Sequence, residues 1–111
     1  MINISTRVAG VTFEDRQSII KKLRYRDKVE FVREPNNSHD PNAIKVMVCP
    51  KNESKFVHLG YIPAELAATL CKTWDEYIYE GEILEIFKGD DSPSHFLHWG
   101  VRVNMFKERK L

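Results

Sequence analysis

Cysteine is scarce in this chain, and long apolar runs and targeting signals are missing. Among its 111 residues only Cys49 and Cys71 are cysteines, and their spacing matches neither a Cys-x-x-Cys metal site nor the framework of a disulfide-rich domain. We expect both thiols to be buried as small apolar side chains. No apolar run approaches the ~20 residues of a membrane-spanning helix, and Met1 to Arg7 lacks the layout of a signal peptide. The sequence therefore predicts no membrane association and a cytoplasmic location, or a nuclear one in a eukaryote.

A strong excess of charge of either sign is also missing, since the formal net charge is +1. The charge is unevenly distributed, however. Residues 1–51 hold ten Lys/Arg and six Asp/Glu, whereas residues 52–111 hold seven and ten, so the two parts carry +4 and −3. A basic face built from the first part would suit nucleic acid, but a solvated surface without a partner explains the same imbalance. Charge alone does not choose between these interpretations.

Signatures of catalysis and of metal binding are not found. His39 and Asp40 are sequence neighbours that point to opposite sides of an extended chain, and no nucleophile motif, phosphate-binding glycine loop or helical metal pair accompanies them. His95 and His98 are three residues apart on a presumed strand, so they face opposite sides and do not suit shared coordination. The sequence therefore predicts a protein that is not an enzyme and that uses no cofactor and no metal.

Apolar periodicity predicts one domain in which strands predominate. Two short helices are expected at residues 13–23 and 64–72, and residues 74–80 fit either a helix tail or an irregular crossing. About six strands are expected, at residues 2–11, 29–33, 43–49, 56–61, 81–88 and 95–106. This pattern indicates a mainly β or α+β barrel over residues 1–106, followed by a frayed tail at residues 107–111.

The loop between the second and third predicted strands is rich in turn-forming residues. Arg33 to Val46 contains two Pro, three Asn and one Asp, which favour a tight and rigid turn. The loop would present polar groups at the rim of the sheet: Asn36, Asn37, His39 and Asp40. Such a loop suits recognition of a ligand. The same side chains also commonly satisfy backbone groups of their own turn, which would explain the pattern without any ligand.

Several aromatic residues lie near predicted turns, where they could stack on nucleic-acid bases. A binding surface for a single strand combines such rings with cations and with hydrogen-bonding groups. The candidate rings are Phe13, His39, Tyr61 and Phe96. Core packing is the alternative for each, and it is favoured for Phe96.

Three motifs together resemble the HIRAN domain, which occurs alone in bacteria and phages and fused to Swi/Snf-type helicases in eukaryotic fork-remodelling proteins. They are Val8 to Phe13, the Glu-Pro-Asn-Asn-x-x-Asp-x-Asn-Ala-Ile-x-Val run from Glu34 to Val46, and the Gly-Tyr-Ile-Pro run at residues 60–63. The similarity covers roughly residues 8–106. It implies a single HIRAN-like domain with an OB-like β-barrel and helices inserted between strands.

The resemblance also implies a function and a site. HIRAN domains that bind DNA use the Asp of this motif to accept a hydrogen bond from a terminal 3′-hydroxyl, a role that falls to Asp40, with Asn37 assisting. Phe13 and His39 would stack on the last bases, and Tyr61 would lie beside the terminal phosphate or sugar. The implied function is a non-catalytic module for single-stranded DNA or DNA ends in repair or replication-fork processing. Repair or helicase proteins are the implied protein partners.

Three positions depart from the pattern of DNA-end-binding relatives. Thr12 stands where they have Arg, His39 where they usually have Tyr, and Ala64 where they have Lys. Three residues could supply the missing positive charge: Arg16, Arg33 and Lys45. These departures leave open whether the domain prefers a 3′ or a 5′ end, and a single strand or a duplex. An interaction domain that binds a peptide segment at a sheet edge is the alternative function.

Overall fold

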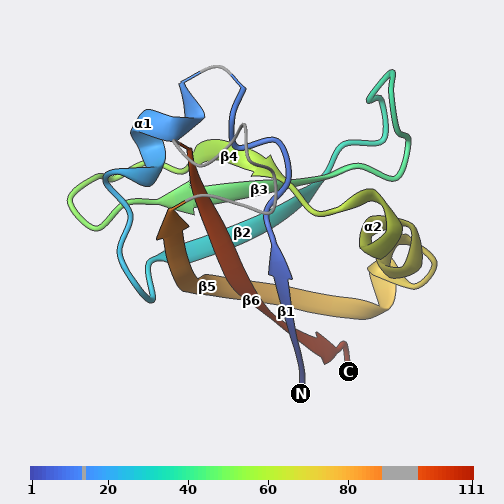
Figure 1. The fold of residues 1–111 in the computed structure, drawn as a ribbon. Coiled ribbons are helices and arrows are strands. Elements are labelled where there is room, and N and C mark those ends of the chain that lie inside the picture. Colours follow the sequence, from blue (N-terminus) through green and yellow to red (C-terminus); the bar gives the residue numbers. More distant parts are fainter. Residues whose placement is uncertain (14, 89–97) are drawn as a thin grey trace.

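The computed structural model describes residues 1–13, 15–88 and 98–111, which form one antiparallel sheet with two short helices (Figure 1). The strands lie in the order β1-β6-β5-β2-β3-β4. Their bounds are β1 (Ile2–Arg7), β2 (Lys28–Arg33), β3 (Ile44–Cys49), β4 (Val57–Tyr61), β5 (Tyr77–Lys88) and β6 (Trp99–Arg109). The prediction of a mainly β fold with about six strands and two short helices is confirmed.

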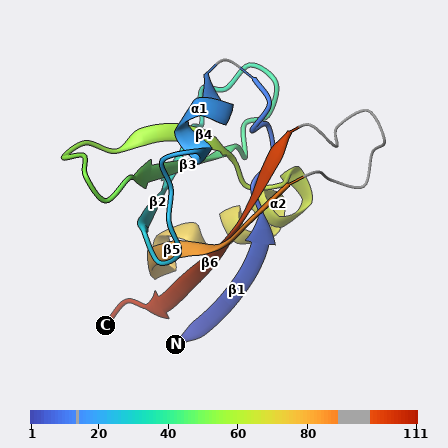
Figure 2. The same ribbon diagram turned by 60° about the vertical axis from the view of Figure 1, so that its left-hand side comes forward.

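The helices occupy different ends of the sheet (Figures 1 and 2). α1 (Arg16–Ile20) packs on β4 and β6, with Ile20 buried. α2 (Ala64–Cys71) begins directly after Pro63, which loses no intrahelical bond at that position, and it buries Ala67 and Leu70. The 3₁₀ turn η1 (Trp74–Glu76) then leads into β5, so the ambiguous stretch at residues 74–80 is part turn and part strand.

The sheet is not closed into a barrel, so this part of the predicted fold class is wrong. The edge strands are β1 and β4, and one isolated bridge between Ala9 and Tyr61 joins their ends. The two residues exchange backbone hydrogen bonds of 2.7 and 2.9 Å. A continuous ladder does not form because β1 ends at Arg7 and the chain turns at Gly10, whose φ of +74° is the left-handed conformation that glycine adopts readily.

The first and last strands differ in length from the prediction. β1 stops at Arg7 rather than near Val11, whereas β6 continues to Arg109. Residues 107–109 therefore belong to a strand and not to a frayed tail. The extension is stabilised because Arg109 pairs with Tyr77 of β5 and its Nη1 lies 2.9 Å from Glu76 Oε1.

Alternating β-branched residues build the core. Ile44, Val46 and Val48 of β3 are fully buried, and the other strands add similar side chains to the same layer: Leu59, Ile83, Val101, Val103 and Met105. The cysteines are not part of this layer. Cys49 and Cys71 are only half-buried, each with its Sγ 3.3 Å from a backbone carbonyl oxygen, so the prediction of buried thiols is wrong.

The substitution Gly60→Ala tests the packing at the bridge between Ala9 and Tyr61. A Cβ at Gly60 would lie 2.3 Å from Ala9 O and 2.7 Å from Val8 Cγ1. Because a backbone oxygen cannot move without breaking the bridge, we expect Gly60→Ala to lower the free energy of unfolding by about 3 kcal/mol or more. Urea denaturation measures this loss. Ser5→Ala, an exposed change on β1, should alter stability by less than about 0.5 kcal/mol, and an equal effect of both changes would contradict the packing argument.

Candidate nucleic-acid interface

An exposed aromatic ring lies at the turn that connects β1 to α1. The N–H of Phe13 donates to Gly10 O at 3.4 Å, and the Phe13 side chain is 65% exposed. The turn forms one wall of a groove of roughly 350 Å³, which is lined by residues 7–13 and Pro63. Thr12 and Phe13 therefore both lie on the groove. An exposed ring beside a groove can accept a base on its face.

Arg16 holds this turn in place through a hydrogen bond. Its side chain is buried, with 6% exposure, and its Nη1 donates to Gly10 O at 2.7 Å. The guanidinium carbon also lies 5.8 Å from the centre of the Tyr61 ring, within range of a cation–π contact. Arg16 is one of three residues that, from the sequence, could supply positive charge at the site. The structure instead places it as a positioning residue that fixes the Gly10 carbonyl and the Tyr61 ring.

Glu34 connects Tyr61 to the Asn-rich loop. Tyr61 Oη donates to Glu34 Oε1 at 2.9 Å, and Asn37 Nδ2 donates to the same oxygen at 2.7 Å. Lys45 Nζ lies 3.6 Å from Glu34 Oε2. These donors stabilise the carboxylate, so the hydrogen bonds from Asn37 and Tyr61, followed by the charge of Lys45, lower the pKa of Glu34. Sequence reasoning missed Glu34, although its position three residues before Asn37 in the motif was a usable signal.

The Asn-rich loop holds its own shape through side-chain hydrogen bonds. Asn37 Oδ1 accepts from the backbone N–H groups of His39 and Asp40 at 2.8 and 3.0 Å, and Asp40 Oδ1 accepts from the N–H of Asn42 at 2.9 Å. Asn37 is thus committed to the turn. Within the described chain Asp40 Oδ2 makes no hydrogen bond, and the His39 side chain is exposed. The loop projects from the body of the molecule, so both groups can meet a ligand (Figure 1).

His58 adds a second ring to the contact around Tyr61. Its ring packs edge-on against Tyr61, with centres 4.9 Å apart, and its Nε2 lies 2.9 Å from Gly60 O. Burial lowers the pKa of His58, and the positive charges of Arg16 and Lys45 lower it further. His58 was also missed, because a lone histidine on a strand carries no motif.

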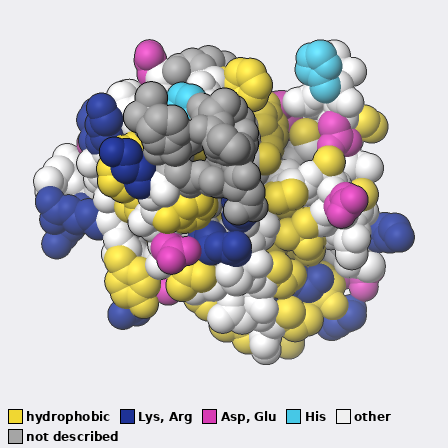
Figure 3. Space-filling model, viewed as in Figure 1, with side chains coloured by type: hydrophobic (Ala, Val, Ile, Leu, Met, Phe, Trp, Pro, Cys, Tyr) yellow, Lys and Arg dark blue, Asp and Glu magenta, His cyan; other side chains and the backbone are white. Residues whose placement is uncertain are grey.

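The structure thus joins four of the nine predicted site residues in one network, together with Glu34, and leaves the others outside it. A single chain of contacts links Arg16, Tyr61, Glu34, Asn37 and Lys45. Phe13 and Thr12 adjoin it through the turn, and His39 and Asp40 adjoin it through the loop. Among the described residues the turn and the loop share no direct hydrogen bond or ring contact. Phe96 lies outside the described residues. Hydrophobic side chains run down the middle of the face shown in Figure 3.

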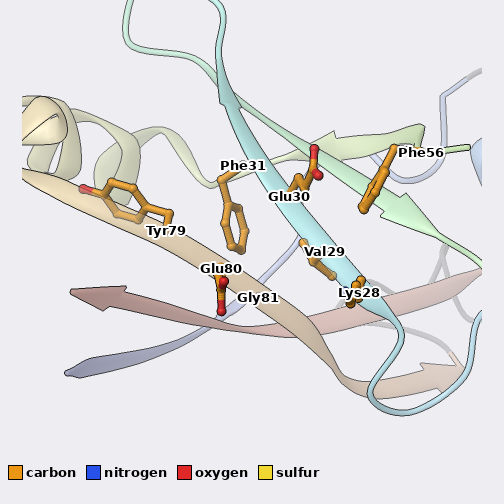
Figure 4. Close-up of a pocket in the computed structure, with 8 residues that line it drawn as sticks. All are labelled: Lys28, Val29, Glu30, Phe31, Phe56, Tyr79, Glu80 and Gly81. Carbon is orange, nitrogen blue, oxygen red and sulfur yellow. The ribbon is translucent and has the colours of Figure 1, made fainter. Parts of the chain in front are cut away.

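A second hollow, of roughly 400 Å³, lies where β2 and β5 diverge (Figure 4). Phe31 and Tyr79 form its apolar walls, while Lys28, Glu30 and Glu80 give its rim an excess of negative charge. Gly81 is required beneath Phe31, because a Cβ there would lie 2.6 Å from the ring. This negative rim does not suit a phosphate backbone, so the groove beside Phe13 is the better candidate for nucleic acid.

Glu34→Gln tests the network. A neutral amide cannot hold the donors of Asn37, Tyr61 and Lys45 as a carboxylate does, so we expect the free energy of unfolding at pH 7 to fall by about 1–2 kcal/mol. The folded-state pKa of Glu34 lies below its ordinary 4.5, so its contribution is present above that pH and disappears as the pH falls through the folded-state pKa.

The two proteins should therefore converge in stability in acid, as measured by denaturation at a series of pH values. The matched control is Glu30→Gln, an exposed change on β2. A constant difference between wild type and Glu34→Gln at every pH would show that the charge of Glu34 is not responsible.

Comparison with known proteins places the fold. The family model described as HIRAN domain matches residues 2–99. The crystal structure of the HIRAN domain of human HLTF is similar, with a TM-score of 0.64 and 21% identity over 97% of this chain and 77% of that one. A crystal structure of a protein from Lactobacillus plantarum is similar with a TM-score of 0.59 and 19% identity, over 94% of this chain and 97% of that one. The search of curated proteins gives no match.

Proposed function

The chain belongs to the HIRAN domain family, and from this premise we propose that it is a non-catalytic module that binds single-stranded DNA or DNA ends and reads the terminal 3′-hydroxyl. DNA as the ligand is implied by the resemblance. The observation that carries the proposal is the exposed Phe13 ring beside a groove, supported from below by Arg16 and Tyr61. The module would act in repair or replication-fork processing, with catalysis supplied by a partner such as a helicase.

Phe13 would be the stacking platform. Two thirds of its surface is exposed, and the hydrogen bond from Arg16 to the Gly10 carbonyl keeps its turn rigid. Rigidity favours binding because little backbone freedom of the turn remains to be lost. His39, at the tip of the Asn-rich loop, supplies a second exposed ring for a neighbouring base.

Asp40 would read the strand end. One of its oxygens is held by the Asn42 N–H, which fixes the direction of the other oxygen. A hydrogen bond from a hydroxyl to a carboxylate contributes about 1.5–3 kcal/mol. The same carboxylate would repel a terminal phosphate, so selectivity for a free hydroxyl follows from one residue.

Arg16 and Lys45 would act through the residues that they hold. Arg16 is buried against Tyr61, and Lys45 pairs with Glu34, so each fixes the position of its partner. Thr12 lies on the groove but carries no charge for a phosphate. Tyr61 donates its hydroxyl hydrogen to Glu34, so its ring and not its hydroxyl would border the sugar.

Phe13→Ala tests the stacking platform. Loss of one base–ring contact costs about 1–3 kcal/mol, so we expect the affinity for a short single-stranded oligonucleotide to fall by about fivefold or more. Fluorescence anisotropy measures the affinity. Ile78→Ala removes a similarly exposed apolar side chain from the start of β5 and should leave binding unchanged. Equal affinity of wild type and Phe13→Ala would remove Phe13 from the site.

Asp40→Ala tests the end reader. Wild type should bind a 3′-hydroxyl oligonucleotide more tightly than the same strand with a 3′-phosphate. The variant should bind the two strands alike, because it has lost both the attraction and the repulsion. Titration of both strands gives the ratio. Asp75→Ala, which removes an exposed carboxylate from η1, should keep the wild-type ratio. Discrimination that persists without Asp40 would assign end reading elsewhere.

A peptide added to the open edge of β1 is the second candidate function. β1 has one unpaired edge, and Ile2 on it is 47% exposed. Salt separates the candidates, because single-strand binding weakens with a log-log slope of about 0.7 per phosphate contacted, whereas an apolar peptide contact changes little.

A further inference from the structure

Positive charge gathers on a surface that the proposed end site does not use. Residues 21–28 and 51–55 hold seven Lys/Arg against Asp27 and Glu53, an excess of five charges. We call these seven cations the basic surface; they are Lys21, Lys22, Arg24, Arg26, Lys28, Lys51 and Lys55, and all are exposed. Dark blue side chains accordingly line the left side of Figure 3, over α1 and the two loops that Figure 1 places there.

Little of this charge is neutralised by neighbours. Lys22 lies 3.2 Å from Glu53, and Arg26 lies 3.6 Å from Glu82. The Asp27 carboxylate is buried and accepts the backbone N–H of Arg24 at 2.7 Å. Five members of the basic surface form no ion pair within the described ranges: Lys21, Arg24, Lys28, Lys51 and Lys55. This unpaired charge attracts a polyanion.

The two segments of the basic surface lie side by side. They line one hollow of roughly 290 Å³, formed by residues 21–24 and 50–53. Lys28 begins β2 opposite Cys49 at the end of β3, which places it next to the same turn. Cations on both sides of a hollow can contact successive phosphates of one strand.

Tyr25 places an aromatic ring among these cations. It is 67% exposed, and its turn is fixed on β5 because Arg26 N donates to Ile83 O at 2.8 Å and Ile83 N donates to Asp27 O at 2.9 Å. Arg26 adopts a φ of +73°, a left-handed conformation that only a few per cent of non-glycine residues adopt. A ring held on a rigid turn between cations matches the platforms that bind single-stranded nucleic acid.

We propose that the basic surface is a second contact site for single-stranded DNA, which holds phosphates with Lys21, Arg24 and Lys51 and stacks one base on Tyr25. A single strand fits better than a duplex because duplex bases are already stacked and cannot cover Tyr25. α1 lies between the turn that carries Phe13 and the basic surface, and its five residues span roughly 7.5 Å at ~1.5 Å per residue, so one strand can reach from Phe13 to the basic surface. The proposal rests on the proposed function only for the choice of DNA as the ligand.

A circular single-stranded oligonucleotide tests this site without end recognition, because it has no end for Asp40 to read. We expect wild type and Asp40→Ala to bind the circle equally. The test variant is Lys21→Gln/Lys51→Gln, and the matched control is Lys72→Gln/Lys110→Gln, which removes two exposed lysines beyond the end of α2 and the end of β6. Tyr25→Ala is compared with Tyr25→Phe, which keeps the ring.

The expected losses follow from the number of contacts removed. Two phosphate contacts contribute about 1.4 to the log-log salt slope, so the slope of the test variant should be smaller than that of wild type by about 1.4. When the salt is raised from about 50 to about 200 mM, the factor by which the affinity falls should therefore be about sevenfold smaller for the test variant than for wild type. The control variant should keep the wild-type slope. Tyr25→Ala should weaken binding of the circle by about fivefold or more, whereas Tyr25→Phe should not. Thermal melts verify that each variant is folded.

The outcomes separate the two proposals. Failure of wild type to bind the circle, or equal slopes for the test and control variants, overturns the second site and leaves the end site standing if Asp40→Ala still loses its discrimination. Loss of circle binding in the test variant, together with no effect of Asp40 on linear strands, supports the second site and overturns the end site. A duplex of equal length that binds as tightly as the circle, with no effect of Tyr25→Ala, overturns the assignment to a single strand.

Discussion

The paired hydrogen bonds between Ala9 and Tyr61 are the contact on which the site depends. They join the two edges of an open sheet at one point. That point exists because Gly60 leaves room for the Ala9 carbonyl, and because the chain can turn sharply at Gly10 immediately afterwards. The turn carrying Phe13 is thereby placed next to a strand that is remote in sequence.

Electrostatics then fix the groups around this point. Arg16 is buried with its charge directed at the Gly10 carbonyl and the Tyr61 ring, and Glu34 gathers three donors from separate elements. Because each charge faces an opposite charge or a carbonyl dipole, the network maintains its geometry without a ligand. The outward-facing groups, Phe13 and Asp40, are therefore held in position before binding, which lowers the entropy cost of association.

Alternating β-branched residues predicted the strands well, because burial on one face of a sheet imposes a period of two. The Asn-rich loop and the exposed Phe13 also followed from local chemistry. Closure of the sheet could not be predicted from local chemistry, because it depends on whether two distant edge strands meet along their length or at one point. The burial of Arg16 and the full role of Glu34 were missed for a related reason: a charged residue is expected at the surface unless its partners are known, and Tyr61, which contacts both residues, lies on a strand remote from them in sequence.

The pairing of β2 with β5 has a mechanical consequence. It covers only Lys28 with Glu82 and Val29 with Gly81, near one end, so the sheet consists of two three-stranded halves that diverge beyond this short seam. The turn before α1 follows the β1 half, whereas the Asn-rich loop connects strands of the other half. A ligand that touches both would join the halves at a further point, and by binding only the folded state it would raise the free energy of unfolding of the domain.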